Sequence, residues 1–174
     1  MEIIDIFWVL FVSMLPIIEL RGAIPIGCGL GLPYHLNYAL AVSGNLLPVP
    51  FILLLIPHVL NIMERFKIFR PIVKWVREKA VKYRSRIVTE VPAESNGKSS
   101  HSEAKMTKGA FLGLLLFVLI PLPGTGAWTG ALVASLFNFP KLKSFFAIAL
   151  GVLGCGIIVS LISYGVLGFL SFLI

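Results

Sequence analysis

The sequence predicts an all-α integral membrane protein made of two inverted repeats, each a re-entrant helical hairpin followed by a transmembrane helix. Three observations support this fold: an apolar composition, charge concentrated in one segment, and an order of short and long apolar runs that recurs on both sides of that segment. Of the 174 residues, 57% are apolar and only 13% are charged, a balance outside the range of soluble domains. Because each spanning helix takes about 20 residues, the chain has room for a few embedded segments and not for a large aqueous domain.

The charge of the chain is concentrated in residues 64–108. This segment holds twelve Lys or Arg and five Glu, which accounts for the whole net charge of +7. A basic excess beside membrane segments is typical of a cytoplasmic loop, so the charge does not imply a nucleic-acid partner. Apolar residues among the basic ones from Phe66 onward predict an amphipathic helix on the membrane surface, in contact with anionic lipid and followed by a flexible polar linker. The chain therefore divides into a first membrane repeat at 1–63, the basic loop at 64–108 and a second membrane repeat at 109–174.

The first repeat combines a short apolar run with a long one. Ile3 to Leu15 makes a helix of about 20 Å, which is too short to cross a hydrocarbon core of about 30 Å. Pro16 and a charged, glycine-containing stretch follow, so we predict a hairpin whose returning arm is Ala23 to Leu32. The long run from Leu36 to Ile62 is then the first transmembrane span.

The second repeat has the same order of parts. Gly109 to Ile120 is the first arm of a hairpin and Ala127 to Phe139 is its returning arm. Ser144 to Ile174 is the second span, and its length requires a tilt, a protruding end or a break near one of its glycines.

A shift of 107 positions relates the two halves, since it carries Pro16 onto Pro123 and Gly44 onto Gly151. Few identities survive, so the order of these landmarks is the argument. With the basic loop in the cytoplasm, the first hairpin lies outside and the second inside, and the halves have opposite topology. This plan is typical of secondary transporters, whose site lies near mid-membrane where broken helices meet. The alternative is four to six ordinary spans in which the prolines are kinks.

Two charged residues, Glu19 and Arg21, lie in the apolar first hairpin, within the stretch PIIELRGAIP at 16–25. An intramembrane charge is costly and marks a functional site by default. At an unwound tip both side chains point into one cavity, where Arg21 binds an anionic group and Glu19 carries a coupling proton, because desolvation favours the protonated carboxyl. The alternative is structural: the charges neutralise each other or cap the ends of the hairpins. Asn45, in the long run that follows, is a further polar candidate, with packing as its alternative role.

The second hairpin carries the stretch PLPGTGAWTG at 121–130. Gly124 and Gly126 permit positive φ and leave N–H groups free at the start of a half-helix, a place that favours anions. The same stretch supplies two hydroxyls and an amphipathic ring, from Thr125, Thr129 and Trp128. Small residues also serve helix packing in membranes, which is the alternative reason for the glycines.

Patterns for catalysis and metal binding are missing from the sequence. It has no His, Cys, Asp and Glu cluster with metal-ligand spacing, no Ser, His and Asp set and no phosphate-binding P-loop. Cys28 and Cys155 lie in apolar surroundings without CxxC spacing, so we interpret them as small packing residues. We therefore expect neither an enzyme nor a cofactor.

The two quoted stretches resemble the signatures of the small multidrug export protein family, Pro-x-x-Glu-x-Arg-Gly-x-x-Pro and Pro-Leu-Pro-Gly-Thr-Gly-x-Trp-x-Gly. The resemblance covers most of the chain apart from the basic loop, and it implies export of small molecules. The layout is also similar to the wider DedA-like group, whose paired re-entrant hairpins imply proton-dependent translocation of lipid phosphates. The second-half arginines of that group have no counterpart here, where Trp128 and the glycines fill the matching region.

Together these observations predict a small proton-coupled transporter or exporter, multi-pass in the inner cell membrane, with a mid-membrane site formed by two hairpin tips. The candidate substrate- and proton-binding residues are Glu19, Arg21, Asn45, Gly124, Thr125, Gly126, Trp128 and Thr129. A homodimer is expected because 174 residues leave little protein to shield two hairpins from lipid. Membrane lipid and a small-molecule or lipid-phosphate substrate are the other expected partners. Two alternatives stay open: a flippase for an anionic lipid carrier such as a polyprenyl phosphate, and a non-transporting membrane scaffold.

Overall fold

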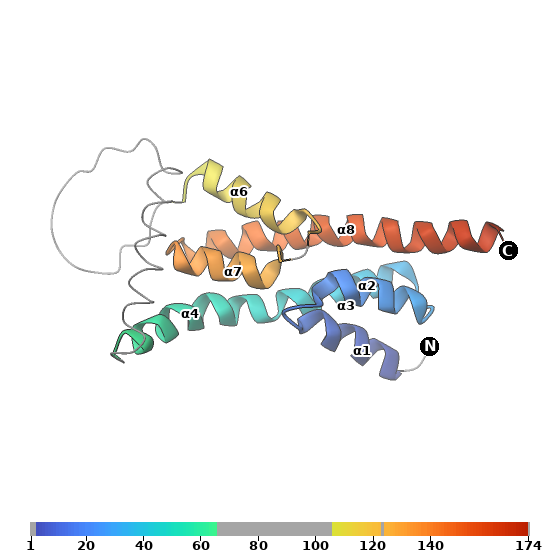
Figure 1. Cartoon of the computed structure of the whole chain (residues 1–174), viewed down its shortest axis with the longest axis horizontal. Coiled ribbons are helices and arrows are strands. Elements are labelled where there is room, and N and C mark those ends of the chain that lie inside the picture. The colour runs from blue at the N-terminus through green and yellow to red at the C-terminus, as the bar shows by residue number, and fades with distance from the viewer. Residues whose placement is uncertain (1–2, 66–105, 123, 174) are drawn as a thin grey trace.

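The structure, a computed structural model, describes residues 3–65, 106–122 and 124–173, and over these ranges it contains helices and no strand (Figure 1). The predicted all-helical fold is therefore confirmed. The predicted amphipathic helix and linker of the basic loop fall on residues 66–105, outside the described residues. The helices of the described ranges are α1 (Ile3–Met14), α2 (Glu19–Gly29), α3 (Tyr34–Leu46), α4 (Pro48–Arg65), α6 (Lys108–Leu119), α7 (Ala127–Leu136) and α8 (Lys141–Leu173).

Two helical segments are long and apolar enough to cross a membrane, Tyr34–Val59 and Lys141–Val166, each of 26 residues. At 1.5 Å per residue each is about 39 Å long, which exceeds a hydrocarbon core of about 30 Å. The first consists of α3 and α4, which join at Leu47. Pro48 has no N–H to continue the helical hydrogen bonds, which explains the change of helix at this point. The second lies in α8, which runs through all of its glycines without a break.

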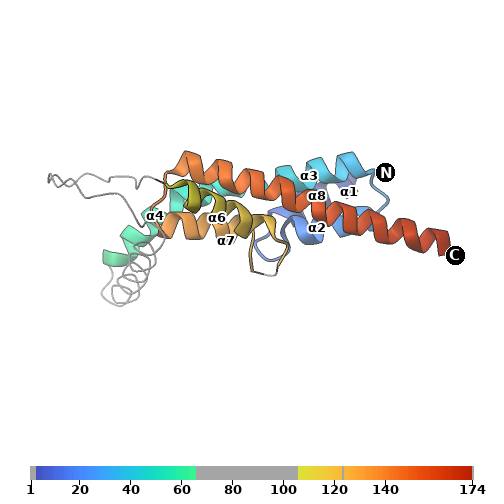
Figure 2. The ribbon, with the colours of Figure 1, turned by 90° about the horizontal axis from the view of Figure 1, so that it is seen from above.

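Two pairs of short helices complete the fold, α1 with α2 and α6 with α7. None exceeds 12 residues, so each is about 18 Å long or less and too short to span the membrane alone. Figures 1 and 2 show the pairs at opposite ends of the long axis, with the connections 15–18 and 120–126 facing each other near the middle.

The first pair differs from the sequence prediction in one respect. The returning arm was expected from Ala23, but α2 already begins at Glu19. Glu19 and Arg21 therefore lie in the first turn of a helix and not in an unwound tip.

Packing contacts cross between the two halves of the chain. Within each half, α1 packs on α3 and α6 packs on α8; between the halves, α2 packs on α8 and α7 packs on α4. Glycines permit the closest approaches: a Cβ on Gly44 would lie 2.5 Å from the Leu10 carbonyl oxygen, and one on Gly151 would lie 2.8 Å from the Leu115 carbonyl oxygen. Backbone contact through small residues is the usual way in which helices associate in lipid.

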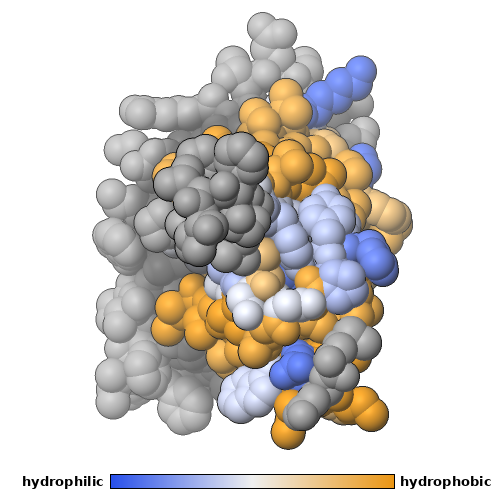
Figure 3. Space-filling view, turned by 90° about the vertical axis from the view of Figure 1, so that its right-hand side faces the viewer, coloured by the Kyte–Doolittle hydropathy of each residue, from blue (hydrophilic) through white to orange (hydrophobic). Residues whose placement is uncertain are grey.

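The interior combines small side chains with larger ones such as Leu20 and Ile24, and many other large apolar side chains lie outside. Ala23, Ala127 and Ala147 are fully buried, whereas Phe7 and Phe51 are each 65% exposed. Seen from the end where both termini lie, apolar residues surround a patch of weakly polar ones (Figure 3). An apolar exterior of this kind matches a lipid environment. In lipid, van der Waals packing and not water exclusion holds the helices together.

Candidate functional site

The connection between α6 and α7 leaves backbone groups without helical partners. A helix ends with unpaired carbonyls and begins with unpaired N–H groups, and such groups need hydrogen-bond partners where they are buried. Gly124 has φ of 84°, a left-handed conformation that glycine adopts without strain. The chain must therefore supply donors for the end of α6 and acceptors for the start of α7.

Arg21 supplies the donors. Its Nη1 donates to the Leu122 carbonyl oxygen, and its Nη2 donates to the Ile120 carbonyl oxygen at 3.3 Å and to Thr125 Oγ1 at 2.9 Å. The Thr125 hydroxyl in turn donates to the Ile120 carbonyl oxygen at 2.8 Å. A cation at the C-terminal end of a helix also interacts favourably with the helix dipole.

Glu19 supplies the acceptor at the start of α7. Its side chain is 6% exposed, and its Oε1 accepts a hydrogen bond from the Trp128 N–H at 3.3 Å, with the Ala127 N–H close by. The N-cap residue of α7 is Gly126, which has no side chain to cap the helix. The carboxyl group of Glu19, which comes from a distant part of the chain, thus caps α7 in place of an N-cap side chain. The N-terminal end of a helix is also the end that favours negative charge.

The glycine at position 126 is required by this contact. Its φ of 167° is extended backbone that any residue adopts, so conformation does not demand a glycine here. A Cβ at this position would instead occupy the space of the Glu19 carboxylate. The N–H groups that meet this carboxyl group are those of Trp128 and, close by, Ala127, and the carboxyl group belongs to the chain itself.

Glu19 also has an unusual backbone. Its φ is 52°, in the left-handed region that residues with a Cβ rarely occupy. Such a conformation costs roughly 1–3 kcal/mol and persists only where the surroundings impose it. Here the contacts of the carboxylate with the start of α7 hold the residue in place.

Trp128 reaches back to the first hairpin. Its Nε1 donates to the Met14 carbonyl oxygen at 3.1 Å, and Met14 is the last residue of α1. Trp128 follows Arg21 by the same 107 positions that relate the two halves. Each of the two side chains thus donates to the C-terminal end of the first short helix in the other half.

Cys155 of α8 completes the surroundings of Arg21. Its side chain is 1% exposed, and the thiol lies close enough to the guanidinium to interact with it. The interpretation of Cys155 as a packing residue fits its burial, but its neighbour was not foreseen. No local motif signals this contact, because it depends on how α8 packs against α2.

The remaining candidates lie outside this cluster. The Thr129 hydroxyl donates to the Gly126 carbonyl oxygen at 3.3 Å, which is a bond within the first turn of α7. Asn45 is fully buried, and neither atom of its amide has a hydrogen-bond partner in the described part of the chain. The structure therefore brings together Glu19, Arg21, Thr125, Gly126 and Trp128, with Gly124 in the same connection, and leaves Asn45 apart. Over the described ranges, no group of three His, Cys, Asp or Glu side chains could hold a metal ion.

These features define a class: a helical membrane protein in which two pairs of short helices meet between two long ones, with a buried Glu and a half-buried Arg at the meeting point. The family model described as "Putative small multi-drug export protein" matches residues 19–158, and the chain belongs to this family. The match contains the first motif from Glu19 onward, which is seven of its ten positions, and the whole of the second. No curated protein and no solved structure matches the chain.

Proposed function

We propose that the protein is a proton-coupled exporter of small molecules, with its site where the two hairpins meet. One observation carries the proposal: a buried Glu and a half-buried Arg from the first hairpin bond the two helix ends at the connection of the second. Membership in a family named for small multidrug export supports the same function.

An inverted-repeat architecture with two re-entrant hairpins is part of the proposal. Three observations support it, beginning with the reciprocal bonds of Arg21 and Trp128. Glu19 and Gly126, which the shift of 107 makes equivalent, contact each other. Gly44 and Gly151, also equivalent, each allow a long helix to touch a carbonyl of a short one. These relations are expected when two halves are related by a pseudo-two-fold axis between them.

Protonation of Glu19 is the proposed coupling step. A charged acceptor makes a hydrogen bond that contributes about 1.5–3 kcal/mol, and protonation of the carboxylate removes this contribution and the interaction with the helix dipole. A change of this size shifts a two-state equilibrium by roughly 10- to 100-fold. Release of the start of α7 would then free the second hairpin to move relative to the first, so that proton binding and substrate release alternate.

The substrate is proposed to bind at Arg21 of this cluster and to reach the Asn45 amide, which lies outside it. Arg21 Nε is buried without a partner, and the fully buried Asn45 amide has both of its atoms free of hydrogen bonds over the described residues. Buried polar groups in this state are costly unless a ligand or water satisfies them. A cytoplasmic basic loop at 64–108, an inner-membrane location and a homodimer complete the proposal.

Transport by the purified protein in proteoliposomes tests the function. We expect ethidium export driven by a pH gradient in the wild type, loss of the gradient dependence in Glu19→Gln and loss of transport in Arg21→Ala. A scaffold predicts the reverse, with both variants silent in cells and deletion of the basic loop harmful. Movement of a fluorescent lipid phosphate across the bilayer, without ethidium export, would support the flippase instead.

A further inference from the structure

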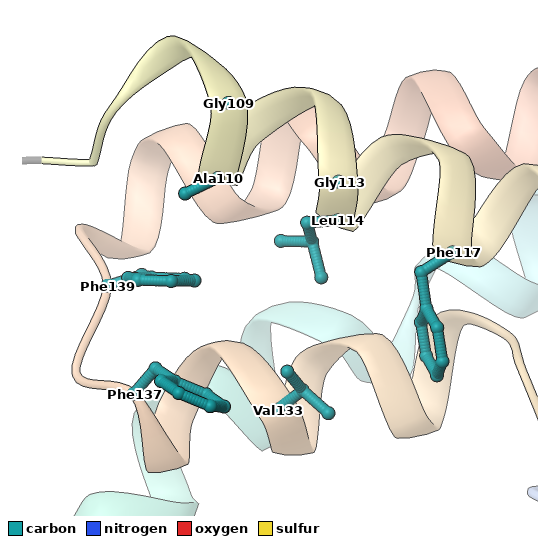
Figure 4. A pocket seen from close by; sticks show the side chains of 8 residues that line it. All are labelled: Gly109, Ala110, Gly113, Leu114, Phe117, Val133, Phe137 and Phe139. Carbon is teal, nitrogen blue, oxygen red and sulfur yellow. The ribbon is translucent and has the colours of Figure 1, made fainter. Parts of the chain in front are cut away.

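A cavity of about 280 Å³ lies between the two arms of the second hairpin (Figure 4). It lies toward the outer ends of the arms, away from the connection that Glu19 and Arg21 hold. The side chains around it are apolar, and three of them are phenylalanines. In Figure 4 these rings and Val133 of α7 face the gap between α6 and α7; the ring-bearing residues are Phe117, Phe137 and Phe139. An uncharged lining of this kind accepts hydrocarbon and excludes a charged group.

Two glycines on α6 keep the cavity open. Gly109 and Gly113 lie four residues apart on one face, both are exposed, and both line the cavity. A Cβ at either position would find no atom within 4 Å, and neither residue has a positive φ. Neither close packing nor backbone conformation therefore requires glycine, although glycine weakens a helix. The remaining physical explanation is that these glycines leave space for another molecule.

The end of the cavity near the start of α6 is basic. Lys108 directly precedes Gly109, and Lys141, which follows Phe139 by two residues, lines the adjoining groove against α4; both lysines are exposed. Lysines at the end of a membrane helix extend toward the interface, where they attract anionic headgroups. The arrangement fits a molecule with an apolar chain and an anionic head.

We propose that the cavity between α6 and α7 binds one acyl chain of an anionic phospholipid from the surrounding bilayer, with its headgroup phosphate at Lys108 and Lys141. The chain fills the space beside Gly109 and Gly113 and keeps the arms of the second hairpin apart. This site is separate from the cluster of Glu19 and Arg21, so the inference does not depend on transport.

Native mass spectrometry of the full-length protein, titrated with phosphatidylglycerol or phosphatidylcholine, tests the site. Gly113→Leu places a side chain in the cavity, and Gly165→Leu is the matched control, because Gly165 is also an open, exposed helical glycine. We expect Gly113→Leu to weaken phosphatidylglycerol binding at least about tenfold, because the added side chain occupies the space of the acyl chain and removes its van der Waals contacts. Gly165→Leu should bind as the wild type does.

The headgroup is tested separately with Lys108→Gln and Lys141→Gln combined, which should remove the preference for phosphatidylglycerol over phosphatidylcholine. Wild-type affinity in Gly113→Leu would overturn the site, and equal wild-type affinity for the two lipids would overturn the headgroup assignment. Thermal unfolding checks that the variants are folded. If Gly113→Leu is not, Gly109→Leu replaces it with the same expected loss.

Discussion

The two hairpins solve the same physical problem in different ways. Both join two short helices, and the free backbone groups at each connection need partners. The connection 15–18 is short and uses its own backbone: the Glu19 N–H donates to the Leu15 carbonyl oxygen at 3.0 Å, and the Gly22 N–H donates to the Ile18 carbonyl oxygen at 3.1 Å. The connection 120–126 is longer, and its ends are bonded by Arg21 and Glu19 of the first hairpin.

The arms of the hairpins differ in the same sense. α1 and α2 pack along each other, whereas α6 and α7 touch little and enclose a cavity. The first hairpin thus packs its own arms together and receives one bond from the second, at the Met14 carbonyl, while both ends of the second connection are bonded by side chains of the first. A hairpin held from outside can be released by a change in those side chains, which is why we place the coupling step there.

The largest expected effect is that of Arg21→Ala. This change removes the side chain of the first hairpin that bonds the end of α6 in the second. The carbonyls of Ile120 and Leu122 lose their charged donor, and we expect a loss of about 2–4 kcal/mol in the free energy of unfolding. Denaturant unfolding in detergent measures it. Arg21→Lys should recover only part, because an ammonium cannot match the planar fork that bonds two carbonyls and a hydroxyl. Full recovery with Lys would contradict the geometry.

Glu19→Gln should have the next largest effect, and on transport more than on stability. The amide keeps the shape and the acceptor oxygen but carries no charge, so the bond to the Trp128 N–H falls to a neutral contribution of about 0.5–1.5 kcal/mol. Transport assayed at several pH values should lose its dependence on pH. An unchanged pH profile would exclude Glu19 as the proton carrier.

Gly126→Ala probes the contact between the hairpins without altering a charge. The extended φ tolerates alanine, but the new Cβ would displace the Glu19 carboxylate, at a cost of about 1–2 kcal/mol in the free energy of unfolding. A double-mutant cycle with Glu19→Ala isolates the cause. The cost should largely disappear in the Glu19→Ala background; an unchanged cost there would mean that the added methyl group disturbs something else.

Trp128→Phe is the mildest test. It keeps an aromatic ring and removes the Nε1–H that donates to the Met14 carbonyl oxygen, so the free energy of unfolding should fall by about 0.5–1.5 kcal/mol. Thermal unfolding compares Trp128→Phe with the wild type and with Thr129→Val. Thr129→Val is the control, because it loses only a bond within the first turn of α7. An effect no larger than that of Thr129→Val would count against a reciprocal bond between the halves.

Much of this arrangement could be predicted from the sequence, because hydropathy and run length reflect local physics. The short and long helices follow from the lengths of the apolar runs, and the importance of Glu19 and Arg21 follows from the cost of charge in lipid. The partners of those charges were harder to predict. That Glu19 caps α7, and that Cys155 lies beside Arg21, depends on the packing of helices distant in the sequence. The capping alternative was foreseen, but only three-dimensional contacts favour it over an anion site left empty for a ligand.

Asn45 is a residue that the sequence identifies but whose surroundings it does not predict. The sequence marks it as a polar residue in an apolar span, and the structure finds it fully buried with no hydrogen bond to its amide in the described ranges. No hydrogen bond joins it to Glu19 or Arg21. Side-chain chemistry alone therefore identified the residue but not its partners.

The most direct test of the central claim is hydrogen exchange of the first turn of α7, measured by mass spectrometry on wild type and Glu19→Gln at the same pH. If the ionised Glu19 carboxylate holds this helix end, the peptide around Trp128 should exchange faster in Glu19→Gln at neutral pH. The difference should vanish at acidic pH, where the wild-type carboxyl is protonated. Equal exchange of the two proteins at every pH would contradict the account.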